Sequence, residues 1–165
     1  MAERTVSRLL PKRRTPPSQT WRTFLANHVR DLVSIDFFTG PTAGLRVLFV
    51  LVVLAHQRRR VVHFNVTEHP TAHWTAQPIV DASPDDTAPS YLRRDRDHVY
   101  GEQFRHRVKG MRIDEVLTTP HSPWQNPFVE RLIGSVRREC LDHIAVLGER
   151  HRRRILAAYF AYYHR

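Results

Sequence analysis

The stretch LVSIDFFTGPTAGLRVLFVLVVLAHQRRRVVHFNVT, residues 32–67, decides the fold. It contains three runs rich in β-branched and aromatic residues, at 32–39, 44–55 and 59–67. Such runs predict strands, and the short spacers between them predict an antiparallel meander. The middle run is almost continuously apolar, which is typical of a central strand buried on both faces.

The rest of the chain alternates between helical and strand patterns. Its residues predict a helix at 71–82 interrupted by Pro78, a strand at 89–95, a helix at 100–111, a strand at 112–118, and helices at 127–144 and 149–165. The order is therefore three strands, helix, strand, helix, strand and two helices. This order predicts an α/β layer fold with a mixed five-stranded sheet flanked by helices.

The N-terminal segment differs in composition from the remainder of the chain. Residues 1–20 contain Pro11, Pro16, Pro17 and the basic run Lys12 to Arg14, which favour a basic, Pro-rich segment over a packed element. The expected division is this segment at 1–20 and a single folded core at 21–165.

Charge and cysteine content restrict the partners and the compartment. The chain has 165 residues, with 26 Lys+Arg against 16 Asp+Glu and a net charge of +10. Such an excess favours a polyanionic partner, most often nucleic acid, although ribosomal and membrane-surface proteins share it. Cys140 is the only cysteine, which fits a reducing cytosol. The longest apolar run, 47–55, is too short for a transmembrane helix, so we expect no membrane partner.

Three acidic residues stand out by their positions. Asp36 interrupts an apolar strand, Asp95 ends a later one, and Glu130 lies in the first turn of a helix, 130 − 95 = 35 positions further on. If they converge, three carboxylates can hold Mg²⁺ or Mn²⁺, which prefer oxygen ligands. Each acid also has an ordinary explanation. Asp36 could be an edge residue that faces water, Asp95 could form an ion pair with Arg94, and Glu130 could simply be favoured at a helix N-terminus.

Three stretches carry a family resemblance. These are SIDFFTGPT (34–42), YLRRDRDHVYGEQF (91–104) and SPWQNPFVERLIGSVRRECLDH (122–143). They resemble the integrase core of insertion-sequence DDE transposases, which is similar to retroviral integrase cores, and the likeness covers roughly residues 30–165. The resemblance implies a ribonuclease-H-like fold and an enzyme that cuts and joins DNA strands.

The same resemblance implies which residues do the chemistry. By position, Asp36, Asp95 and Glu130 correspond to the three acids that bind two divalent ions, Mg²⁺ or Mn²⁺. In the family the second acid ends a strand and precedes a turn and then an aromatic residue. Asp95 and Tyr100 fit that order, and Asp97 falls at the turn, where a side-chain oxygen can accept from nearby backbone N–H groups.

Several polar and basic residues near these acids are candidate DNA contacts. They are Gln125, Asn126, Arg137, Arg138 and Lys109. Arg137 and Arg138 could equally be solvated charges. The basic run 151–154 could contact phosphate, although its pattern favours the wet face of the last helix. The resemblance also implies a homo-oligomer on DNA ends in the cytoplasm, associated with the nucleoid.

Three functions stay open from the sequence. The first is metal-dependent DNA cleavage and strand transfer. The alternatives are an inactive DNA-binding remnant of a transposase and a ribonuclease-H-like nuclease. The segment 1–20 would be the remnant of an upstream helix-turn-helix region, and the core would be truncated at its C-terminus.

Overall fold

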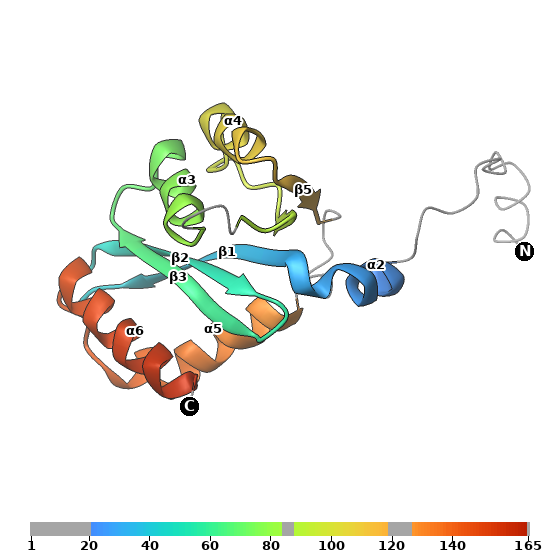
Figure 1. Ribbon diagram of the computed structural model, residues 1–165. Helices are drawn as coiled ribbons and strands as arrows, with labels where there is room; N and C mark the ends of the chain where they lie inside the picture. The colour runs from blue at the N-terminus through green and yellow to red at the C-terminus, as the bar shows by residue number, and fades with distance from the viewer. Residues whose placement is uncertain (1–20, 84–87, 119–126, 165) are drawn as a thin grey trace, which may run out of the picture.

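The computed structural model describes residues 21–83, 88–118 and 127–164 (Figure 1). The elements are α2 (Trp21–His28), η1 (Val29–Asp31), β1 (Leu32–Pro41), β2 (Val47–Ala55), β3 (Arg60–Thr67), α3 (Ala72–Asp81), β4 (Tyr91–Arg94), α4 (Glu102–Gly110), β5 (Asp114–Leu117), α5 (Pro127–Glu139), η3 (Leu141–His143) and α6 (Glu149–Tyr163). Residues 1–20, including the expected helix-turn-helix remnant, lie outside the described ranges.

The five strands form one mixed sheet in the order β3-β2-β1-β4-β5. The pairs β1–β2 and β2–β3 are antiparallel, which confirms the predicted meander. The pairs β1–β4 and β4–β5 are parallel, so α3 and α4 are the crossover connections that parallel strands require. The predicted mixed five-stranded sheet is confirmed.

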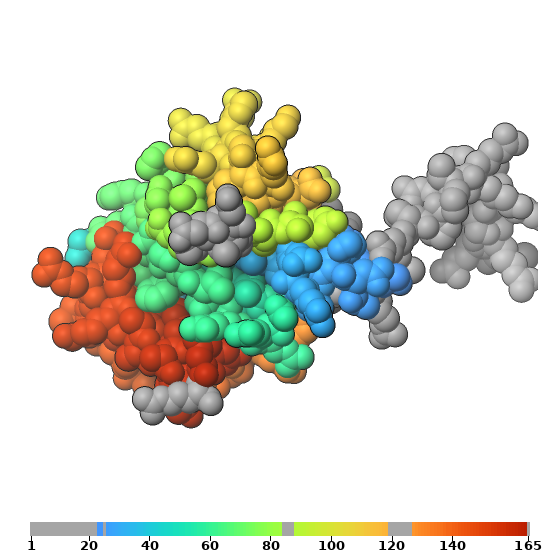
Figure 2. All heavy atoms as spheres, in the orientation of Figure 1, coloured from blue at the N-terminus to red at the C-terminus, as the bar shows by residue number. Residues whose placement is uncertain are grey.

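Helices cover both faces of the sheet. Figure 1 shows α3 and α4 above it and α5 and α6 below it, and the space-filling view of Figure 2 shows the same two layers at opposite ends of the molecule. Each face has its own core, one containing Val50 and Val52 under α5 and α6, the other containing Leu51 and Val53 under α3 and α4. Because successive side chains of β2 enter opposite cores, its sequence is apolar throughout.

Some boundaries differ from the sequence-based expectations. Pro78 does not interrupt α3, which continues to Asp81 with Pro78 itself buried in the core. Thr71 caps this helix by accepting a hydrogen bond from the Trp74 backbone N–H at 3.1 Å. The helix expected at 127–144 ends at Glu139 and is followed by η3. The sequence patterns did not predict α2, whose Phe24 ring packs edge-on against Tyr91.

Candidate active site

Asp36 projects from the middle of β1 toward α5. Strand alternation puts it on the same face as Phe38, which lies in the core under α5 and α6, whereas Ile35 enters the opposite core. The backbone N–H of Phe37 donates to the Asp36 Oδ1 at 2.8 Å. The sheet therefore presents this carboxylate, partly buried, to the layer that carries Glu130.

Asp95 directly follows β4, beside Asp36. The parallel register pairs Leu32 with Tyr91 and Ser34 with Arg93, a constant offset of 91 − 32 = 59 positions. Continued past the end of β4, the same offset aligns Asp36 with Asp95, since 95 − 36 = 59. Partial burial raises the pKa of Asp95, and the charge of nearby Asp97 raises it further.

Glu130 reaches the site from the first turn of α5. This helix buries an apolar stripe that includes Val129, Leu132 and Val136 and leaves Glu130 exposed. Burial raises the pKa of Asp36 from 3.8 to about 7, and repulsion from Asp95 and from Glu130 adds to this rise. Two of the predicted acids, Asp95 after β4 and Glu130 on α5, thus lie close enough for their charges to act on the third, Asp36.

The chemistry of these carboxylates suits a divalent cation. Carboxylate oxygens are the ligands that Mg²⁺ and Mn²⁺ prefer, and a cation would relieve the repulsion that now raises the pKa of Asp36. In the part of the chain that the structure describes, no three His, Cys, Asp or Glu side chains are arranged closely enough to hold one ion. The carboxylates are therefore of the type that binds such a cation, but the side chains of the described residues do not form a complete set of ligands around one ion.

Asp97 has the turn geometry that the sequence predicted. Its Oδ1 accepts from the Val99 backbone N–H at 3.1 Å, and its carbonyl accepts from the Tyr100 N–H at 3.2 Å. The Asp97 N–H in turn donates to the Asp95 Oδ1 at 3.2 Å. The acids that raise the pKa of Asp36 are Asp95 and Glu130, and Asp97 is not among them.

Arg94 faces away from the acids, because successive side chains of a strand point to opposite faces. Its Nε donates to Glu115 Oε2 at 2.6 Å, and its guanidinium lies 5.0 Å from the centre of the Tyr100 ring. Arg93, by contrast, is 1% exposed and lies on the same face as Asp36, whose pKa its charge lowers. Burial lowers the pKa of Arg93 to about 10. Sequence reasoning missed this buried cation, because Arg93 stands in a run of charges that resembles a solvated surface.

His56 and Tyr100 are further buried polar groups next to the acids. His56 Nε2 and Ser34 Oγ are hydrogen-bond partners, and the His56 ring meets Phe128 edge-on at 5.5 Å. Burial and the charge of Arg93 lower the pKa of His56 to about 4, so its imidazole is neutral at pH 7. Burial raises the pKa of Tyr100 well above its usual value, and the charges of Asp95 and Asp36 act in the same direction.

The predicted DNA contacts are only partly gathered at the site. Arg137 is exposed on α5, and its guanidinium carbon lies 5.9 Å from the centre of the Phe38 ring. Arg138 is also exposed, and its Nη1 would lie 3.2 Å from a Cβ built on Gly134. The space that Gly134 leaves on the surface of α5 therefore holds a side chain of the same helix.

Of the remaining predicted contacts, Lys109 is the one within the described residues. Lys109 is exposed near the end of α4, on the other face of the sheet, so the structure does not bring it to the acids. Gln125 and Asn126 lie outside the described residues.

Comparisons with known proteins bear on the fold. Residues 111–165 match the family model "Integrase core domain". No similar sequence was found among curated proteins. The catalytic domain of Mos1 mariner transposase is similar with a TM-score of 0.69 at 12% identity, over 86% of this chain and 77% of that one.

Two retroviral structures are also similar. A chain of the simian T-cell lymphotropic virus intasome gives a TM-score of 0.59 at 16% identity, over 66% of this chain and 38% of that one. The HTLV-2 integrase catalytic core, solved in complex with magnesium, gives 0.54 at 13% identity, over 66% and 67%. This chain thus corresponds to well under half the length of the intasome chain. It has the ribonuclease-H-like fold of integrase and transposase catalytic cores, and its residues 111–165 match the integrase core domain itself.

Proposed function

We propose that this chain is the catalytic core of a DDE-type polynucleotidyl transferase that cuts and joins DNA strands. One observation carries the proposal: the charges of Asp95, at the end of β4, and of Glu130, on α5, both act on the partly buried Asp36 of β1 and raise its pKa. Burying a carboxylate inside an apolar strand is costly, so the placement of Asp36 is best explained by a cation that it binds.

Each acid has a distinct part in this proposal. Asp36 and Asp95, aligned on neighbouring parallel strands, would hold Mg²⁺ or Mn²⁺ between them, and Glu130 would complete the site from α5. When bound, two such ions activate an attacking oxygen and stabilise the leaving oxygen of a phosphodiester. The sheet would hold Asp36 in place, while Asp95 and Glu130, both exposed, would adjust as the ligands assemble.

The basic charge of the chain would serve DNA binding. The net charge of +10 and the exposed Arg137 on the helix of Glu130 would attract and hold the phosphate backbone. Gln125 and Asn126, just before α5, would contact the DNA as it enters the site. Like other enzymes that join two DNA ends, the protein would act as a homo-oligomer. It would act in the cytoplasm, where its DNA substrate lies. Within the described ranges, no helix combines the length and apolar character that crossing a membrane requires.

The test is metal-dependent cleavage by the full chain and by Asp36→Asn, Asp95→Asn and Glu130→Gln. Binding of Mn²⁺, followed by its magnetic resonance signal, gives a second readout that does not depend on turnover. Each substitution should abolish cleavage and weaken Mn²⁺ binding while leaving the circular dichroism spectrum unchanged. Full activity in any one variant would remove that residue from the site.

A second candidate is a protein that binds DNA without cutting it. The observation in its favour is the buried Arg93 beside Asp36, because a fixed positive charge there repels a divalent cation. Under this alternative the wild-type chain binds DNA equally well with EDTA or with Mg²⁺ and cleaves in neither. Comparing DNA duplex with an RNA–DNA hybrid under Mn²⁺ would separate strand transfer from a ribonuclease-H-like activity.

A further inference from the structure

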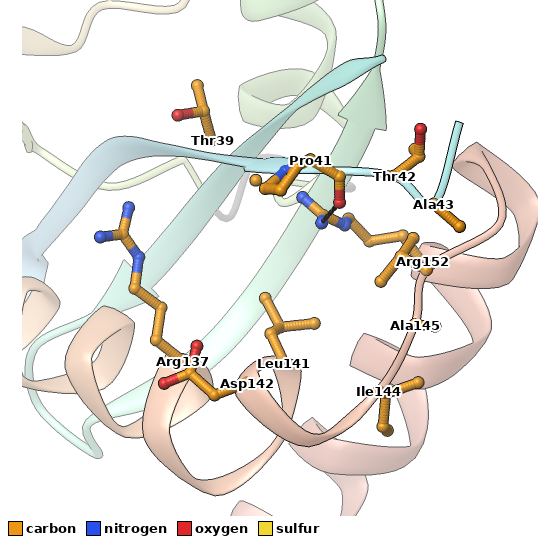
Figure 3. A pocket seen from close by; sticks show the side chains of 12 residues that line it. Thr39, Pro41, Thr42, Ala43, Arg137, Leu141, Asp142, Ile144, Ala145 and Arg152 are labelled. Atoms are coloured by element: carbon orange, nitrogen blue, oxygen red, sulfur yellow. Dashed lines mark hydrogen bonds between the residues drawn. The ribbon is translucent and has the colours of Figure 1, made fainter. Parts of the chain in front are cut away.

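A cavity of about 450 Å³ lies away from the three acids, between the end of β1, the C-terminal part of α5, η3 and the start of α6 (Figure 3). Two arginines line it from different helices, Arg137 on α5 and Arg152 on α6. Figure 3 shows both side chains rising toward β1, on either side of Leu141. The cavity is therefore bordered by two cations under one strand.

Arg152 is an unusual wall for a cavity because it is buried at 2% exposure. Its Nη2 donates to the Pro41 carbonyl at 3.0 Å. Its Nε and Nη1 have no hydrogen-bond acceptor among the described residues. Burial lowers the pKa of Arg152, and no carboxylate of the described residues acts against this. A buried guanidinium with two donors left over is costly unless an anion or another acceptor completes it.

The backbone is shaped around this guanidinium. A Cβ built on Gly40 would lie 2.7 Å from both Nη1 and Nη2 of Arg152, so a side chain at this position would displace the guanidinium. The absence of a side chain at Gly40 is what lets the guanidinium lie against β1. The guanidinium of Arg152 thus occupies the space that Gly40 leaves, where its Nη2 donates to the Pro41 carbonyl.

The cavity lies in line with the acids along two elements. Gly40 is four residues beyond Asp36 on β1, about 13 Å at the rise of a strand. Arg137 is seven residues beyond Glu130 on α5, about 10 Å at the rise of a helix. A DNA strand whose scissile phosphodiester lies at the acids would pass the cavity with one of its other phosphates.

We propose that this cavity holds a backbone phosphate of the bound DNA strand, with Arg152 as its deepest contact and Arg137 at its mouth. Guanidinium N–H groups donate readily to phosphate oxygens, and Nε and Nη1 are the Arg152 donors that no acceptor among the described residues fills. Among the described residues that line the cavity, Asp142 is the one carboxylate, and its charge opposes the anion. The inference rests on the DNA substrate of the proposed function and not on cleavage.

Inorganic phosphate tests the cavity without DNA or catalysis. The melting temperature of the full chain is measured in sodium phosphate and in sodium chloride of equal ionic strength, in EDTA. Phosphate should raise the melting temperature of wild type more than that of Arg152→Leu. The rise in Asp142→Asn should be at least as large as in wild type, and Arg152→Lys should keep part of it. An equal gain in wild type and Arg152→Leu overturns the site.

DNA binding tests the identity of the phosphate. Affinity for a short duplex is measured by fluorescence anisotropy over a range of salt concentrations, in EDTA so that no strand is cut. Loss of one phosphate contact lowers the slope of log K against log salt by about 0.9. Arg152→Leu should show this loss, and Arg154→Gln, an exposed arginine of the same helix, should show less. A slope unchanged in Arg152→Leu overturns the assignment to DNA phosphate, even if cleavage proves genuine.

Discussion

Asp95 lies 59 positions after Asp36, and the same offset of 59 separates each paired residue of β1 and β4. Continued one residue past the end of β4, this register aligns the two acids. A shift of one residue in that register would turn Asp95 toward the opposite face of the sheet. Convergence of the first two acids is thus a property of the sheet, and only Glu130 depends on how α5 packs.

The first prediction separates Asp95 from Asp97. Asp95→Asn should lose metal-dependent DNA cleavage at unchanged stability, because Asp95 faces Asp36. Asp97→Asn should keep cleavage, since an amide oxygen can still accept from the Val99 N–H. Asp97→Ala should lose about 1 kcal/mol of unfolding free energy with that bond. Cleavage assays and urea unfolding on the three variants measure both effects. Loss of cleavage in Asp97→Asn with retention in Asp95→Asn would reverse the assignment.

The second prediction concerns pH. Asp36 has a pKa of about 7 in the folded chain against 3.8 unfolded, so the folded state binds more protons between these values. Its stabilising contribution is present at pH 4 and is lost as the pH rises to 7. The difference in unfolding free energy, Asp36→Asn minus wild type, should therefore grow across this window by up to ~1.4 kcal/mol per pH unit and stay level above it.

Taking the difference between these two proteins removes other titrations. His56 acts in the opposite direction, because its pKa is lowered to about 4 and its contribution grows as the pH rises from 4 to 6.5. Both proteins retain His56, so its effect cancels. Urea unfolding without metal at a series of pH values gives the result, and a difference that does not change with pH would contradict the raised pKa of Asp36.

The third prediction is that Arg93 competes with the metal. Arg93→Leu removes a buried positive charge from the face of Asp36, and it should raise the affinity for Mn²⁺ and raise the pKa of Asp36 still further. Arg96→Leu, a change of the same kind at an exposed neighbour, serves as the control. Mn²⁺ titration of the two variants measures the effect. Weaker Mn²⁺ binding in Arg93→Leu would mean that Arg93 instead holds the carboxylates in position.

The fourth prediction concerns the ion pair on the other face of β4. Glu115→Ala leaves the guanidinium of Arg94, whose side chain is 4% exposed, buried without its carboxylate, and should cost about 3 kcal/mol. Glu68→Ala breaks a pair whose Arg46 side chain is 58% exposed, and should cost at most about 1 kcal/mol. Replacing both members, Arg94→Met with Glu115→Leu, should recover most of the loss. Thermal and urea unfolding decide between these outcomes, and equal costs for the two single changes would show that burial does not set the strength of these pairs.

Local patterns in the sequence determined much of the fold. The continuous apolar run of β2, the alternation at the start of β1 and the short spacers define an antiparallel meander, because these features depend only on neighbouring residues. The apolar stripe of α5 likewise predicts which side of the helix is buried. The turn at Asp97 follows from its own side chain, which bonds to a backbone N–H two residues away.

Tertiary structure alone decided which charges are buried. Arg93 and Arg152 stand in basic runs that look solvated, yet they are 1% and 2% exposed, because strand and helix packing turn these particular members of each run inward. The high pKa of Asp36 likewise depends on burial and on acids 59 and 94 positions away, since 130 − 36 = 94. Sequence determines which groups are present and their local geometry. Their electrostatic environment depends on distances through space, which exist only once the sheet and its two helical layers have assembled.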